Sequence, residues 1–256
     1  MITVAHSSAY TKTGDLEMYY ELHGEASAHR PLVLLHGGVC TVGLSFGAVL
    51  PALAGTRQVV APELQGHGHT ADTGRALTVP ALASDVVALL DELGIEQADF
   101  LGFSLGALTA LEVAVRHPGR VGRLVLASAP YTQDGFLPEI QDPASGSSRL
   151  PTPRDFREMA DAYAAVAPHP ERFQDLLAQC SAAAHAPLPW TADDLRALRA
   201  PTLLVIGDTD FVRIEHAAEM RDLIPHARLA VLPGTTHMAL MRRTALLLPL
   251  LHEFLD

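Results

Sequence analysis

The sequence has little of what nucleic-acid-binding and membrane-bound proteins depend on. Basic residues are in the minority, because 18 Lys and Arg stand against 29 Asp and Glu, and the formal net charge is −11. Nucleic acids and anionic membrane surfaces both attract basic patches, so neither is an expected partner. The acidic residues are spread along the chain, as on an ordinary solvated surface.

Cysteine is nearly absent, since Cys40 and Cys180 are the only two. A disulfide framework would need more cysteines in a much shorter chain, so we expect two free thiols. The N-terminal stretch "MITVAHSSAYTKTGD" has neither the basic start nor the apolar segment of a signal peptide. No uncharged apolar run is long enough to span a bilayer. These absences predict a cytoplasmic protein with no membrane anchor.

What the chain does contain is an alternation of strand-like and helical patterns. Its 256 residues are 48% hydrophobic, which is enough for one large domain with a sizeable core. Alternation of this kind predicts a mostly parallel sheet with helices on both faces and a ligand site at the carboxyl ends of the strands. The expected strands are 16–22, 31–38, 57–64, 98–104, 122–130, 200–208 and 227–234, and the expected helices are 78–94, 105–117, 215–224 and one from about 238.

The alternation lapses between residues 131 and 197. This interval contains the loop-like "DPASGSSRLPTP" and two helical patterns, 154–167 and 170–186. We expect a helical lid over the site, because the insertion leaves from the edge of the sheet where ligands bind and is far longer than an ordinary connection. A peripheral helical decoration is the alternative. The predicted core therefore comprises 1–130 and 198–256, and the predicted cap comprises 131–197.

One serine stands between two glycines where an apolar strand turns into a helix. The stretch 102–106, "GFSLG", matches the pattern G-x-S-x-G. Chance matches to so short a pattern are common, so its context must carry the argument. A tight turn here would require small residues around Ser104 and would place its hydroxyl at a helix N-terminus, where negative charge is favoured.

With its neighbouring motifs, this stretch resembles the α/β-hydrolase fold family, in the branch that uses a serine nucleophile. The resemblance covers nearly the whole chain and includes "LLHGG" (34–38), "APELQGHGHT" (61–70), "PTLLVIGDTDFV" (201–212) and "LPGTTHMAL" (232–240). It implies a mostly parallel central sheet flanked by helices, with a helical cap inserted between the sixth and seventh strands. Glu63 and Thr70 stand where the family usually has Asp and Ser, at positions that are not catalytic.

The resemblance also implies a catalytic triad in the chain order Ser, Asp, His. His237 matches the family position of the base, and the pattern G-x-x-D selects Asp210 over Asp208 as the acid. Asp208 reads instead as a turn residue. Some relatives carry the acid after the preceding strand, but there this chain has "LASAP" with Ser128, and Asp134 a few residues later is the reserve candidate.

Two backbone amides are expected to form the oxyanion hole, which stabilises charge that appears only during the reaction. One belongs to Leu105, directly after the serine. By resemblance the other belongs to Gly38, and Val39 is left open as an alternative. We expect His36 to shape this loop through hydrogen bonds to the backbone rather than to react.

No metal or cofactor is expected. His67 and His69 in "GHGH" could suggest a metal site, but no nearby set of Asp, Glu or Cys completes a coordination shell. The glycines of "HGGVCTVG" lack the spacing of a dinucleotide-binding loop and the lysine of a phosphate-binding loop.

The lid is expected to supply substrate specificity through an apolar pocket. An apolar pocket suits an ester or lactone with an apolar acyl or alcohol part. For most of the aromatic candidates, anchoring the lid to the sheet is an equally good interpretation. The candidate pocket residues are Val39, Phe103, Phe136, Tyr163, Trp190 and Met238.

We therefore expect a serine hydrolase that cleaves small carboxylic esters or lactones through an acyl-enzyme. Carbon–carbon bond hydrolases and cofactor-free perhydrolases use the same triad and remain alternatives. A non-enzymatic ligand-binding member of the fold is a further alternative, which the complete triad disfavours.

Overall fold

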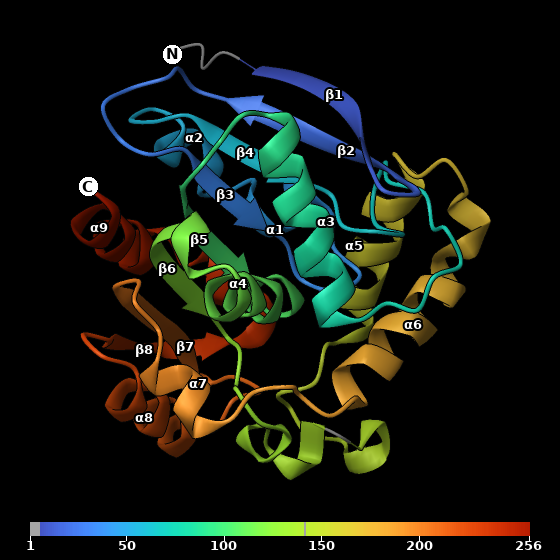
Figure 1. Cartoon of the computed structure of the whole chain (residues 1–256). Helices are drawn as coiled ribbons and strands as arrows, with labels where there is room; N and C mark the ends of the chain where they lie inside the picture. Colours follow the sequence, from blue (N-terminus) through green and yellow to red (C-terminus); the bar gives the residue numbers. More distant parts are fainter. Residues whose placement is uncertain (1–5, 141) are drawn as a thin grey trace.

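The computed structural model describes residues 6–140 and 142–256 and contains one eight-stranded sheet (Figure 1). The strands follow the order β1-β2-β4-β3-β5-β6-β7-β8. β2 pairs antiparallel with β1 and β4, and every pair from β4–β3 to β7–β8 is parallel. The mostly parallel sheet predicted from the sequence is thereby confirmed. The strands are β1 His6–Thr13, β2 Leu16–His23, β3 Leu32–Leu35, β4 Val59–Pro62, β5 Ala98–Phe103, β6 Val121–Ala127, β7 Thr202–Thr209 and β8 Arg228–Thr236.

The register of the central strands brings their carboxyl ends together. Leu35 of β3 lies opposite Gly102 of β5, and Phe103 of β5 lies opposite Ala127 of β6. Ala127 in turn lies opposite Val205 of β7. The segments that follow these strands therefore leave the sheet at one edge, where ligands bind in sheets of this kind.

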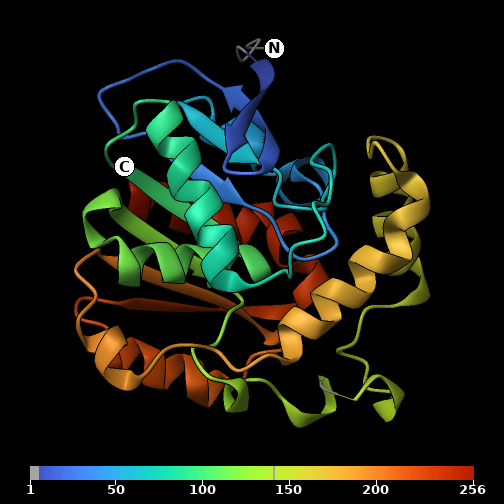
Figure 2. The same ribbon diagram turned by 45° about the vertical axis from the view of Figure 1, so that its right-hand side comes forward.

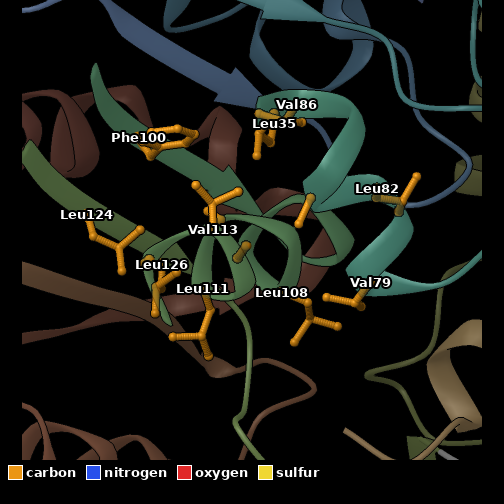
Figure 3. Close-up of a cluster of buried hydrophobic side chains, with 14 of the residues drawn as sticks. Leu35, Val79, Leu82, Val86, Phe100, Leu108, Leu111, Val113, Leu124 and Leu126 are labelled. Carbon is orange, nitrogen blue, oxygen red and sulfur yellow. The ribbon is translucent and has the colours of Figure 1, made fainter. Parts of the chain in front are cut away.

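Helices cover both faces of the sheet. α3 and α4 pack their apolar sides on one face together with α8, while α1, α2 and α9 pack on the other (Figure 1). Figure 3 shows the first of these cores, where Leu82 of α3 and Leu108 of α4 lie with Phe100, Leu124 and Leu126 of the sheet. Because both faces are covered, the central strands consist almost entirely of buried apolar residues. The helices are α1 Val42–Phe46, α2 Leu50–Leu53, α3 Val79–Glu92, α4 Leu105–Arg116, α8 Ile214–Leu223 and α9 Thr244–Leu255.

Local signals in the sequence explain where α3 begins and ends. The Thr78 hydroxyl accepts a hydrogen bond from the Ala81 N–H, and Pro80 occupies the first turn. Gly94 follows the helix with φ +65°, a conformation that glycine adopts without strain.

A helical cap region lies between β6 and β7, as predicted. It contains α5 Pro153–Ala164, α6 Phe173–His185 and α7 Ala192–Arg196, with short 3₁₀ turns before α5 and between α5 and α6. Figure 2 shows α6, the gold helix, beside the edge of the sheet where the central strands end. Thr152 and Asp155 exchange side-chain and backbone hydrogen bonds in a capping box at the start of α5. The domain limits at 130 and 198 remain a prediction.

Polar contacts tie the cap to the rest of the molecule, and three of them lie at separate points of the cap. The Trp190 indole donates to the Glu112 carboxylate of α4 over 2.6 Å, and both residues are buried. Arg242 donates to Glu158 of α5 over 2.7 Å. The Gln179 amide of α6 donates to Asp72 over 3.0 Å. The cap is thus anchored at both of its long helices and at its return to the sheet.

Several parts of the fold differ from the elements expected from the sequence, among them the short helices α1, α2 and α7, which were not predicted. Residues 6–13 form β1, an edge strand whose alternating polar residues gave no clear apolar pattern. The last helical segment divides into a 3₁₀ turn, His237–Arg242, and α9. Within the described residues, no helix has the length and apolar character needed to cross a membrane.

Candidate active site

The turn between β5 and α4 holds Ser104 in a strained conformation. Its φ is 53° and its ψ is −118°, a region that costs a residue other than glycine about 1–2 kcal/mol. The glycines on either side let neighbouring backbone segments lie closer to the turn than a side chain would permit. A Cβ at Gly102 would lie 2.3 Å from the Gly106 carbonyl oxygen, and one at Gly106 would lie 2.0 Å from the Leu35 carbonyl oxygen. The pattern G-x-S-x-G thus has a steric cause in this fold.

Ser104, His237 and Asp210 come together at the edge formed by β5, β7 and β8. The Ser104 Oγ lies 3.1 Å from His237 Nε2, and His237 Nδ1 lies 2.8 Å from Asp210 Oδ1. Asp210 is fully buried and His237 nearly so. The ring of Phe211 stacks on the His237 imidazole with their centroids 3.8 Å apart. This is the geometry of a Ser–His–Asp triad.

The Asp210 carboxylate is held in its ionised form. Burial would raise the pKa of this carboxyl, but the interaction with His237 and the hydrogen bonds that it accepts lower it below its ordinary value. Oδ1 accepts from the Phe211 N–H over 2.6 Å, and Oδ2 accepts from the Gly207 N–H over 3.1 Å. A negative charge is therefore fixed beside His237 Nδ1.

Ser128 joins this network, which the sequence did not lead us to expect. Its Oγ lies 2.6 Å from Asp210 Oδ1 and 2.6 Å from His237 Nδ1. The residue directly follows β6, is buried, and has φ 60°. The sequence offered one clue to this contact: Ser128 follows a strand end, in the place where some relatives carry the acid.

The competing carboxylates lie elsewhere. Asp208 accepts hydrogen bonds from the N–H groups of Gly234 and Thr235, so it joins the end of β7 to the end of β8. Asp134 pairs with the nearby Thr132 hydroxyl. Neither carboxylate has a hydrogen bond to His237 among those that the structure describes.

The loop after β3 leaves one amide free for the oxyanion and engages another. Val39 donates its N–H to His67 Nε2 over 3.0 Å. This amide is therefore already engaged, which argues against the alternative in which Val39 supplies the oxyanion hole. Neither the Gly38 N–H nor the Leu105 N–H, at the first position of α4, has a hydrogen-bond partner among the described residues. These two amides are the pair that the sequence predicts.

Two buried histidines shape this loop and stay neutral. His36 Nδ1 lies 2.8 Å from the Gly37 carbonyl oxygen, and His36 Nε2 accepts the Leu64 N–H over 3.0 Å. Burial lowers the pKa of His36 to about 3 and that of His67 to about 4. The prediction that His36 hydrogen-bonds the backbone is confirmed. His69 turns away from His67 and bonds to the Glu63 carboxylate.

One group of side chains in the described part of the chain is compact enough to hold a metal ion. It consists of His6, Glu21 and His23 on the β1–β2 hairpin, whose donor atoms lie within 4.8 Å of one another. His23 Nε2 is already 2.7 Å from a Glu21 oxygen. None of the three lines the cavity at Ser104.

A cavity of about 280 Å³ opens above Ser104, between the sheet edge and the cap. No Lys, Arg, Asp or Glu occurs among the described residues that line it. Its wall therefore suits an apolar, uncharged ligand. The residues that line it are Gly38, Val39, Ser104, Leu105, Leu108, Phe136, Ile140, Leu150, Pro151, Phe156, Met159, Leu177, Cys180, Ser181, Ala184, His185, Phe211, His237 and Met238.

The structure places three of the six predicted pocket residues on this wall and corrects the other three. Val39, Phe136 and Met238 line the cavity. Phe103 lies in the core behind the site, 5.0 Å from the His237 ring between centroids. Tyr163 packs inside the cap against Phe173, and its hydroxyl donates to the His169 carbonyl. The third, Trp190, anchors the cap to α4 as described above.

Comparison with known proteins agrees with the fold. Residues 32–247 match the model of the Alpha/beta hydrolase family. The chain belongs to this family. It is a hydrolase with a Ser–His–Asp triad that acts on small molecules. The family therefore accounts for the strained serine turn, for the order of the three triad residues and for a cap between β6 and β7.

Relatives of different specificities resemble this hydrolase. A 2-hydroxymuconate semialdehyde hydrolase from Pseudomonas sp. (strain CF600) is 30% identical, over 90% of this chain and 88% of its own length. The structure of a 2-hydroxy-6-oxo-6-phenylhexa-2,4-dienoate hydrolase from Rhodococcus sp. strain RHA1 matches with a TM-score of 0.78 at 22% identity, covering 98% and 99% of the two chains. Est816, described as an N-acyl homoserine lactone degrading enzyme, matches with a TM-score of 0.74 at 25% identity, covering 96% and 100%. These relatives leave the bond that is cleaved open.

Proposed function

We propose that this hydrolase cleaves small, uncharged carboxylic esters or lactones through an acyl-enzyme formed on Ser104. His237 takes the proton from the Ser104 hydroxyl as the oxygen attacks the carbonyl carbon. Asp210 accepts the Nδ1–H of His237 and so keeps the lone pair of Nε2 directed at Ser104. The Ser–His distance of 3.1 Å allows this proton transfer.

Charge that develops on the carbonyl oxygen would be stabilised by the amides of Gly38 and Leu105. Both belong to segments held rigidly at the sheet edge, and Leu105 adds the positive end of the α4 dipole. His237 then returns its proton to the leaving alkoxide. A water molecule activated by the same imidazole attacks the acyl-enzyme and releases the acid.

The proposal of an uncharged substrate rests on the kinds of residue that line the cavity. Its described residues are almost all apolar. The polar side chains that line it are those of the proposed reaction, together with Ser181 and His185 on α6 of the cap. A carboxylate on the substrate would lose its hydration there without gaining a lysine or arginine partner. An ester or lactone with an apolar chain would bury that chain favourably.

Hydrolysis of a carbon–carbon bond is the second candidate, and the relatives favour it. The 2-hydroxymuconate semialdehyde hydrolase matches nearly the whole chain, and its substrate's name denotes a carboxylate-bearing compound. The dienoate hydrolase whose structure matches is likewise named for a substrate that bears a carboxylate. The same triad also serves cofactor-free perhydrolases, for which no feature of this cavity argues specifically.

A substrate panel tests the choice between these reactions. It contains aryl esters of graded chain length, lactones of graded ring and chain size, and a 2-hydroxy-6-oxo-dienoate. We expect kcat/KM for the best ester or lactone to exceed that for the dienoate at least a hundredfold. A higher value for the dienoate would assign the carbon–carbon reaction to this chain.

A second measurement tests whether Ser104 reacts at all. A fluorophosphonate should label Ser104 in the wild type and should leave the Ser104→Ala variant unlabelled, as read by mass spectrometry of the labelled peptide. A wild-type chain that takes up no label would support the non-enzymatic alternative.

A further inference from the structure

We propose that Ser128 is a positioning residue of the triad, which holds Asp210 and His237 together. This proposal rests on the function proposed above. The three atoms involved form a small triangle, with sides of 2.6 Å from Ser128 Oγ to each partner and 2.8 Å between His237 Nδ1 and Asp210 Oδ1.

Counting protons fixes the direction of each hydrogen bond in this triangle. An ionised carboxylate accepts hydrogen bonds and donates none, so the Ser128 hydroxyl must donate to Asp210 Oδ1. The lone pairs of the Ser128 oxygen are then free toward His237. The Nδ1–H of His237 is shared between two acceptors, Asp210 Oδ1 and Ser128 Oγ, which fixes the proton on Nδ1 and leaves Nε2 to face Ser104.

The backbone at Ser128 is strained and hydrogen-bonded to the next strand, and this fixes the position of its side chain. Ser128 has φ 60°, where glycine would be free of strain, and its N–H donates to the Val205 carbonyl over 2.8 Å. It is 1% exposed, so bulk water does not compete for its hydroxyl. It lines no part of the cavity, so it acts on the reaction through Asp210 and His237 rather than through substrate.

Two variants separate the hydroxyl from the strain. Ser128→Gly removes the hydroxyl and suits the positive φ, while Ser128→Ala removes the hydroxyl and keeps the strain. Both should lower kcat and the rate of fluorophosphonate labelling by about tenfold to a hundredfold, because each loses a hydrogen bond to a charged group. KM should stay within twofold. A Ser128→Gly chain that labels and turns over within twofold of the wild type would overturn the proposal.

Labelling keeps the two proposals apart. If the wild type labels but hydrolyses no ester or lactone of the panel, the substrate proposal fails and the Ser128 test still applies. If the wild type does not label, the triad mechanism fails and the role of Ser128 fails with it.

Discussion

At the scale of single residues, the two aspartates of "GDTD" make opposite predictions. Asp210→Asn should lower kcat by about 10⁴-fold, because an amide in its place favours the wrong tautomer of His237. Asp208→Asn should leave kcat within threefold, because the Asp208 carboxylate bonds to the backbone of Gly234 and Thr235 and not to His237. Steady-state kinetics on the best panel substrate decide, and the reverse pattern would move the acid to Asp208.

The two cysteines should be slow to react although one of them faces the substrate cavity. Burial raises the pKa of Cys40 to about 11 and that of Cys180 to about 12, so little thiolate is present near pH 8. Iodoacetamide should alkylate Cys180 at least a hundredfold more slowly in the folded protein than in urea. Mass spectrometry over time measures this, and equal rates in the two conditions would show that the thiol is not held neutral.

At the scale of elements, the cap contains two kinds of residue. Some anchor the cap to the core, and others line the substrate cavity. Trp190→Phe should lower the free energy of unfolding by about 1–3 kcal/mol, because the buried Glu112 Oε2 loses the indole donor and keeps only the longer contact of its other oxygen with Arg116. Its KM should stay within twofold. Urea unfolding and steady-state kinetics on the same preparation test both halves of the prediction.

Phe156 is the matched residue on the binding side of the cap. It lines the cavity from α5 and is 39% exposed, so it contributes little to the packing of the cap. Phe156→Ala should raise KM about 3- to 10-fold, as expected for one apolar contact, while the midpoint of urea unfolding changes little. A lowered midpoint with an unchanged KM would instead make Phe156 an anchor.

The sequence predicted the elements better than the directions of their side chains. Strands with covered faces are apolar throughout, so the pattern that locates β5 does not say which face Phe103 joins. The triad was predictable because its residues follow strand ends in a characteristic order. The role of the Val39 amide was not, since it depends on His67, 28 residues away, reaching back to the loop. The contact of Ser128 with His237 likewise spans 109 residues and two strands.

At the scale of the whole molecule, the buried histidines make stability depend on pH. His67 has a pKa of about 4 in the folded protein, against about 6.5 in an unfolded chain. Between these values the unfolded chain binds a proton that the folded protein does not, so stability falls as the pH is lowered from 6.5 to 4. His36, with a pKa of about 3, adds to the same loss.

His67→Gln tests this account, because glutamine can still accept the Val39 N–H but does not titrate. The free energy of unfolding of the wild type should fall more steeply than that of the variant between pH 6 and 4.5, by about 1.4 kcal/mol per pH unit. Urea unfolding at a series of pH values measures both slopes. Parallel slopes would show that His67 does not stay neutral on folding.

The distribution of backbone strain bears on how this enzyme could be engineered. Val39, Ser104 and Ser128 are three of the four non-glycine residues with positive φ in the described part of the chain, and all three border the triad or the oxyanion loop. Each costs about 1–2 kcal/mol that the rest of the fold must offset. A search for heat-resistant variants would therefore favour Ser104→Gly, which relieves this strain, and a search for fast variants would reject it, because it removes the attacking hydroxyl. Selection for durability and selection for turnover act on the same few residues in opposite directions.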